Sequence, residues 1–185
     1  MKIAINAGHT ISGKGTGAVG YLTEGSEARR VVNALIPILK ARGVDVIDAT
    51  VDTAASNAEY LKKAVTIANN AKADLFISIH FNAGGGTGCE CFTWRGNKLK
   101  QAQGICANLT KLGFRDRGVK DGSAFYIIKN TTMPAVLVET CFVDNYADYV
   151  LYSKLGAARV AAAIADGICD DTKLFCENCK RVLTT

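Results

Sequence analysis

The chain has 185 residues, of which 49% are hydrophobic and 21% charged, and its formal net charge is +5. This length suits one domain with a sizeable core, and the composition excludes disordered, collagen-like and low-complexity proteins. The positive charge suits an anionic partner, but no run of Lys and Arg resembles a nucleic-acid-binding arm, so we expect no nucleic-acid partner.

Strands and helices alternate along the chain. Apolar runs predict strands at 3–6, 44–47, 74–80, 89–94, 124–129 and 135–140. Apolar residues at helical spacing predict helices at 24–42, 57–72, 97–112 and 153–168. The alternation predicts an α/β fold with three α/β/α layers around a mostly parallel, mixed sheet of about six strands. This domain spans 1–168, and 169–185 are expected to form a short polar C-terminal tail.

The sequence lacks the usual signals of export. Asn6 and Gly8 follow the N-terminus too early for the core of a signal peptide, and no apolar run approaches the roughly 20 residues of a membrane helix. The seven cysteines are odd in number, and several lie in apolar segments, which indicates reduced thiols. We expect a monomer made in the cytoplasm, without a signal peptide and without insertion into a membrane.

Both histidines of the chain, His9 and His80, come at the ends of apolar strands. Ligands of α/β proteins bind beyond the carboxyl ends of the strands, so both imidazoles are expected at one site. A catalytic zinc ion needs at least one further ligand and an open coordination position. Candidate carboxylates are those that open the next helix, lie on the strand after the second histidine or end an apolar strand: Glu24, Glu27, Glu90 and Glu139.

Some of these carboxylates have a common structural role and others do not. Glu24 and Glu27 share one helix face, and either of them can serve as the acidic residue that a helix N-terminus favours. Glu139 ends the apolar run 135–138, where an acid costs free energy unless it is paired or used. A carboxyl group in that setting should have a raised pKa, which suits a general acid/base.

Several motifs occur together in a fixed order. They are the histidine after the first strand, the acid that opens the next helix, and the segments 78–83 (SIHFNA), 117–120 (RGVK) and 134–139 (PAVLVE). Over 1–168 the sequence resembles the zinc-dependent N-acetylmuramoyl-L-alanine amidases of the cell-wall hydrolase type, which include phage endolysins. The resemblance implies that His9, Glu24 and His80 bind Zn²⁺ and that Glu139 is the catalytic acid/base. The helix length of this family, counted back from Gly43, implies that the ligand is Glu24 rather than Glu27.

The resemblance also implies a reaction and a partner. The substrate would be the amide between the lactyl group of N-acetylmuramic acid and the L-alanine of the stem peptide in peptidoglycan. Zinc would polarise the scissile carbonyl, while Glu139 takes a proton from water and gives one to the departing amine. The enzyme would reach the wall after release by phage or prophage lysis, or during mother-cell lysis.

Three other functions fit parts of the sequence. The segment 8–14 has the glycine and lysine spacing of a P-loop, but Gly15 replaces the required Ser or Thr and no helix follows. A zinc carboxypeptidase-like wall peptidase would need an arginine for a terminal carboxylate, and the candidates are Arg95, Arg115 and Arg117. A catalytically silent wall-binding module is expected to have lost Glu139 or a histidine, and all of them are present.

A second metal site is an open alternative for the cysteines. Two of them lie at alternate positions of one predicted strand, and two more form a C-x-x-C motif near the C-terminus: Cys89, Cys91, Cys176 and Cys179. Four thiolates of this kind can hold a structural zinc ion. Ordinary thiols are the simpler interpretation, because the turn glycines that usually flank such sites are missing.

Overall fold

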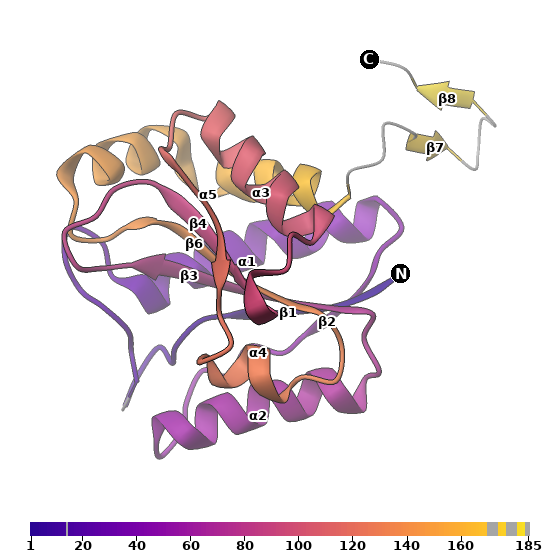
Figure 1. Ribbon diagram of the computed structural model, residues 1–185, viewed down its shortest axis with the longest axis horizontal. Helices are drawn as coiled ribbons and strands as arrows, with labels where there is room; N and C mark the ends of the chain where they lie inside the picture. Colours follow the sequence, from indigo (N-terminus) through magenta and orange to yellow (C-terminus); the bar gives the residue numbers. More distant parts are fainter. Residues whose placement is uncertain (14, 170–173, 177–180, 184–185) are drawn as a thin grey trace.

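A six-stranded sheet forms the centre of the protein in the computed structural model, which describes residues 1–13, 15–169, 174–176 and 181–183 (Figure 1). The sheet has the order β2-β1-β3-β6-β4-β5. Its strands are β1 (Lys2–Ala7), β2 (Asp45–Asp48), β3 (Leu75–Asn82), β4 (Cys89–Thr93), β5 (Asp116–Asp121) and β6 (Ala135–Phe142). The strands β2, β1, β3 and β6 run parallel, whereas β4 pairs antiparallel with β6 and parallel with β5. The predicted mixed, mostly parallel sheet is therefore confirmed.

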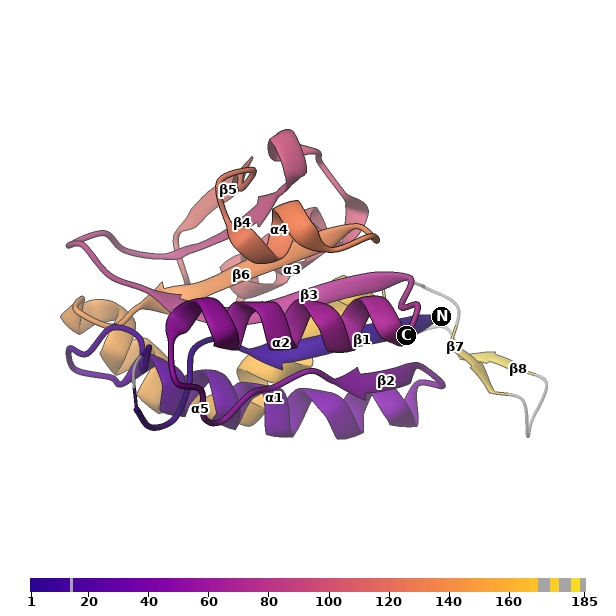
Figure 2. The same ribbon diagram turned by 90° about the horizontal axis from the view of Figure 1, so that it is seen from below.

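Helices cover both faces of this sheet (Figure 2). On one face α1 (Glu24–Ala41) and α3 (Lys100–Lys111) pack against α5 (Tyr146–Ile168), and on the other α2 (Asn57–Asn70) contacts α4 (Tyr126–Asn130). A short 3-10 helix, η1 (Trp94–Gly96), follows β4, while β7 (Leu174–Cys176) and β8 (Arg181–Leu183) form a separate antiparallel pair. Within the described part of the chain, no helix has both the length and the apolar character needed to cross a bilayer.

The central strands are apolar because both faces of the sheet are covered. In β3, seven of the eight residues are buried, and β6 has the same number. Helix α1 contributes an apolar stripe at helical spacing, and its members are Ala28, Val31, Val32, Leu35 and Leu39. This packing fixes the carboxyl ends of β1, β3 and β6 relative to the start of α1.

One predicted element is wrong. The apolar pattern predicts a strand at 124–129, but this segment contains most of the short helix α4, and the neighbouring segment Asp116–Asp121 is the edge strand β5 instead. The sequence of β5 is DRGVKD, whose residues are half-buried or exposed, so it lacks the apolar pattern that identifies a strand. The apolar pair Ile127 and Ile128 is buried on one side of a helical turn, where it imitates a short strand.

Candidate metal centre and active site

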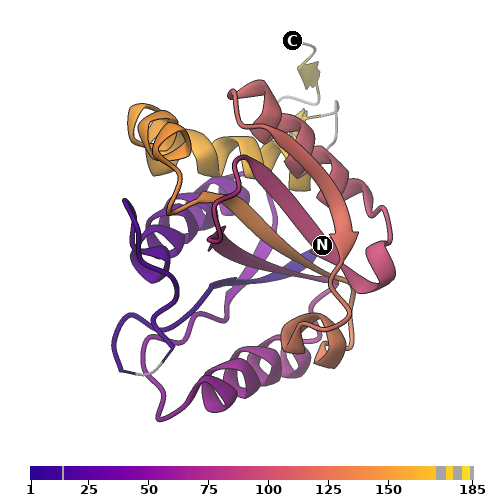
Figure 3. The ribbon, with the colours of Figure 1, turned by 60° about the vertical axis from the view of Figure 1, so that its left-hand side comes forward.

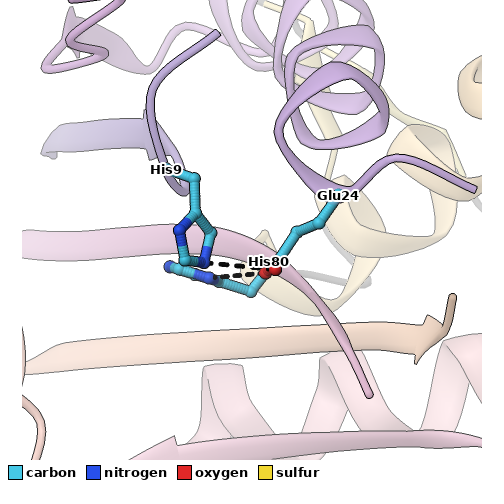
Figure 4. Close-up of side chains that lie close together, drawn as sticks. All are labelled: His9, Glu24 and His80. Carbon is cyan, nitrogen blue, oxygen red and sulfur yellow. Dashed lines mark hydrogen bonds and ion pairs between the residues drawn. The ribbon is translucent and has the colours of Figure 1, made fainter. Parts of the chain in front are cut away.

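The three side chains expected to bind a metal converge at the carboxyl ends of β1 and β3 (Figure 4). His9 comes two residues after β1, His80 is the third residue from the end of β3, and Glu24 is the first residue of α1. One donor atom of each side chain lies within 4.8 Å of the other two. Glu24 and His80 are buried and His9 is half-buried, so solvent reaches the cluster at His9.

Glu24 occupies the centre of the cluster. Its Oε2 lies 3.2 Å from Nε2 of His9, and its Oε1 lies 3.0 Å from Nδ1 of His80. Each oxygen also accepts a backbone N–H, from Ala18 at 2.9 Å and from Phe81 at 3.2 Å. Burial opposes ionisation, but the hydrogen bonds with His80 and His9 outweigh it and hold the pKa of Glu24 well below its ordinary value. The cluster is therefore built around an ionised carboxylate.

The ring of His9 is oriented by the backbone. Its Nδ1 lies 3.0 Å from the carbonyl oxygen of Gly15, which accepts the ring proton. Nε2 then faces the carboxylate of Glu24 with a lone pair, so a second proton or a metal ion has to lie between these two acceptors. Burial lowers the pKa of His9 and the hydrogen bond with Glu24 raises it, with a net increase. The site thus favours a positive charge at this position.

The backbone of His9 is held from both sides, in the left-handed conformation with φ of 63°. Its N–H donates to the Tyr60 hydroxyl at 2.9 Å, and its carbonyl accepts from Nη2 of Arg29 at 3.0 Å. The buried Arg29 guanidinium also donates to the carbonyls of Gly25 and Val51 and to the carboxylate of Asp52. Sequence reasoning missed both supports. The one available signal was an arginine within the buried stripe of α1.

Glu139 lies beside this cluster on β6. It is paired in register with His80 of β3 on one side and with Glu90 of β4 on the other, so the three side chains point to the same face. Its Oε2 is shielded from solvent and has no hydrogen-bond partner among the described residues. Burial, followed by the negative charges of Glu24 and Glu90, raises the pKa of Glu139 well above its ordinary value, as expected from the sequence.

The other two candidate carboxylates are engaged elsewhere. Oε2 of Glu27 accepts from the hydroxyl of Tyr152 at 2.9 Å, so Glu24 and not Glu27 contacts the histidines. Glu90 accepts from Asn82 and from Arg117, each at 2.7 Å, and also from Lys120. Burial raises the pKa of Glu90, but the bonds from Lys120 and Arg117 outweigh it and lower the pKa overall. Glu139 thus differs from both by its unpaired oxygen.

The described residues of the alternative interpretations are not members of the cluster. Arg117 is paired with Glu90, and the guanidinium of Arg95 lies 5.7 Å from the ring centre of Trp94. Within the described residues, the cluster of Figure 4 is the one group of three metal-binding side chains close enough to share an ion. Among the cysteines whose side chains the structure describes, four are buried as free thiols: Cys89, Cys91, Cys106 and Cys141. Lys14, Cys179 and the side chain of Cys176 lie outside the described residues.

Comparison with known proteins gives consistent matches. The family model of N-acetylmuramoyl-L-alanine amidases matches residues 3–170. An uncharacterized protein of Clostridium perfringens is 38% identical over 180 residues, which cover 91% of this chain and 51% of that protein. The endolysin of Bacillus phage SPP1 is 33% identical over 179 residues, covering 90% and 64%. The chain therefore spans about half the length of the first of these relatives and just under two thirds of the second.

A solved structure shares the whole fold. The catalytic domain of the CD27L endolysin, which targets Clostridia Difficile, superposes with a TM-score of 0.85 at 30% sequence identity. The superposition covers 92% of this chain and 98% of that domain. The six-stranded sheet and its helices therefore match a complete catalytic domain.

Proposed function

Because the chain belongs to the family of N-acetylmuramoyl-L-alanine amidases, we propose that it hydrolyses the amide between the lactyl group of N-acetylmuramic acid and L-alanine in peptidoglycan. Family membership confirms the resemblance that the motifs carry. The activity rests on one observation above all: the unpaired, buried oxygen of Glu139 lies one strand away from the His9–Glu24–His80 cluster. A binding module would have no use for this costly arrangement.

We propose that the cluster binds Zn²⁺. Two imidazoles and one carboxylate are a donor set of catalytic zinc sites, and it leaves a position open for water or substrate. Bound zinc supplies Lewis acidity towards the scissile carbonyl and towards water. An ion pair alone would account for the partners of Glu24, but it would not account for a carboxyl group that is left unpaired directly beside it.

Glu139 is the proposed general acid/base. Burial raises the pKa of its carboxyl group and so brings it closer to the pH at which the enzyme works. The unpaired Oε2 is free to accept a proton from the attacking water. The same oxygen then donates a proton to the nitrogen of L-alanine, which leaves poorly as an amide anion and readily as an amine. One residue therefore performs both proton transfers.

The products distinguish this proposal from its rivals. Purified cell walls are digested with the protein, and newly formed amino groups and released residues are identified by labelling and mass spectrometry. The amidase is expected to expose the amino group of L-alanine and to leave a lactyl carboxylate on the glycan. Release of a C-terminal residue would instead identify a carboxypeptidase, and binding without any cleavage would identify a wall-binding module.

Arg29 is expected to support metal binding through the backbone of His9. In Arg29→Lys, an ammonium group cannot reproduce the four hydrogen bonds of the guanidinium, so the position of His9 becomes less well defined. The affinity for Zn²⁺ should fall about 10- to 100-fold, as measured by competition with a chromogenic chelator. The control is Arg30→Lys on the exposed side of the same helix. Equal affinities of the two variants would contradict this role.

The proposed site of action is the bacterial cell wall, reached after release during lysis. The endolysin of Bacillus phage SPP1 among the relatives supports this, as does the CD27L domain. We also propose that 1–168 form the catalytic domain, that the tail 169–185 lies outside it, and that the protein acts as a monomer.

A further inference from the structure

Three tyrosines form an exposed aromatic cluster near the candidate active site. Tyr21 and Tyr146 are 56% and 64% exposed, and Tyr149 is half-buried beneath them. The ring centres are 5.6 Å apart for Tyr21 and Tyr146, 5.5 Å for Tyr21 and Tyr149, and 6.1 Å for Tyr146 and Tyr149. We call these three residues the tyrosine cluster.

Exposed apolar residues also flank the tyrosine cluster in the sequence. Val19 is 71% exposed and Val150 is 44% exposed, and each lies one or two residues along the chain from a tyrosine of the cluster. Single exposed apolar side chains are ordinary, but a contiguous group of them marks an interaction surface. Tyrosine is common at such surfaces because its ring is apolar and its hydroxyl forms hydrogen bonds.

The tyrosine cluster is tied to the active site through the backbone. Tyr21 precedes Glu24 by three residues, which span at most about 11 Å. In the same segment Ala18 donates its N–H to the carboxylate of Glu24 and accepts the N–H of Glu24 at its carbonyl. Tyr21 in turn donates its N–H to the carbonyl of Val143 at 2.8 Å. The cluster therefore begins within a few residues of the candidate metal ligand.

The other two tyrosines lie at the start of the helix that follows the strand carrying Glu139. Val143 directly follows β6, and α5 begins just beyond the end of that strand with Tyr146 and Tyr149 in its first turn (Figure 3). One segment of the cluster thus leads into Glu24 and the other follows β6, at the end of the sheet where the proposed chemistry occurs. A ligand that extends from the active site along this side meets the tyrosine rings.

We propose that the tyrosine cluster binds the glycan strand of peptidoglycan next to the cleaved amide, which rests on the proposed amidase function. The scissile amide is attached to a sugar, so on one side the substrate leaves the site as a polysaccharide. Pyranose rings have apolar C–H faces and hydroxyl edges, which match the ring face and hydroxyl of tyrosine. The cluster contributes no carboxylate or ammonium group, so the proposed binding rests on the sugar rings and hydroxyls and not on the charge of the lactyl groups.

Binding to peptide-free glycan strands tests this proposal without any hydrolysis. Such strands contain no amide bond to the stem peptide, so the unmodified full chain can be titrated with them by calorimetry. We expect Tyr21→Ala and Tyr146→Ala each to weaken binding about tenfold, as truncation of an aromatic anchor does. Tyr146→Phe should retain most of the affinity, because the ring remains. Tyr126→Ala, which removes a 41% exposed tyrosine on α4, is the matched control and should bind as the native chain does.

Kinetics on two substrates separates the two proposals. With intact cell walls, Tyr146→Ala should raise KM about tenfold at unchanged kcat, and with a soluble muramoyl peptide that has no neighbouring sugars it should behave as native. If the native chain cleaves neither substrate, the amidase function fails, and the glycan titration still tests the cluster. Native affinity for glycan strands in the alanine variants would overturn the cluster proposal. The proposal would also be overturned if the alanine variants had a lower molar mass than the native chain in light scattering but the same affinity for glycan strands. The surface would then join two copies of the chain.

Discussion

Replacing Glu139 by Gln is expected to lower kcat on peptidoglycan about 10²- to 10⁴-fold, with little change in KM or in the amount of bound zinc. Glutamine preserves the volume of the side chain but can neither accept the proton of water nor return one to the leaving amine. Because Glu139 is outside the His9–Glu24–His80 cluster, the metal should remain bound.

Turbidity loss of purified walls gives the rate, and elemental analysis of the same samples gives the zinc content. Glu27→Gln is the matched control, since Glu27 is a buried glutamate whose carboxylate bonds to Tyr152. If Glu139→Gln clears the walls as quickly as the native chain, the proposed acid/base is wrong. Loss of zinc from the variant would instead assign Glu139 to the metal site.

The same substitution should change how stability depends on pH. The folded state raises the pKa of Glu139, so it holds this proton more tightly than the unfolded chain does. Stability is therefore lost as the pH rises from the ordinary glutamate value towards the raised one. In metal-free protein, Glu139→Gln should be more stable than the native chain at pH 8, and this advantage should shrink at pH 4. Urea unfolding at both pH values measures it, and an equal difference at both would contradict the sign.

Glu24→Gln is expected to abolish zinc retention and, with it, activity. The amide is a much weaker ligand than the carboxylate, and its NH₂ group would face a backbone N–H that now donates to Glu24. We expect the affinity for Zn²⁺ to fall by more than about 100-fold, beyond the loss typical of residues that only support a ligand.

Zinc content after dialysis and competition with a chelator measure this loss. Glu27→Gln again serves as the control, because it changes the same residue type one helical turn further along. If Glu24→Gln keeps one zinc ion and the native rate, the contacts of Glu24 with His9 and His80 form a structural ion pair and nothing more.

Apolar patterning predicts the layers of the fold because the central strands are buried on both faces. The same rule fails at the sheet edge, where β5 has the polar sequence DRGVKD. The two histidines could be predicted at one site because the carboxyl ends of parallel strands meet there. Residue patterns alone could not separate Glu24 from Glu27. In the structure the two carboxylates differ because that of Glu27 accepts a hydrogen bond from Tyr152, a residue distant in sequence.

Residues that act through tertiary contacts left little trace in the sequence. Arg29 and Tyr60 reach His9 only after α1 and α2 have packed on the sheet. The tyrosine cluster likewise joins Tyr21 to residues at the start of α5, and no local pattern connects these two segments. Both features follow from packing, which periodicity does not describe.

The origin of the three candidate ligands in three separate elements has a thermodynamic consequence. A metal ion bound by His9, Glu24 and His80 would cross-link the loop after β1 to α1 and β3, and the unfolded chain holds no such arrangement. Binding to the native state alone adds about 4 kcal/mol of stability when the free ion is at a thousand times its dissociation constant. The melting temperature of the protein would then rise with the concentration of free metal. The fraction of folded protein at a given temperature would therefore depend on how much metal the surroundings supply.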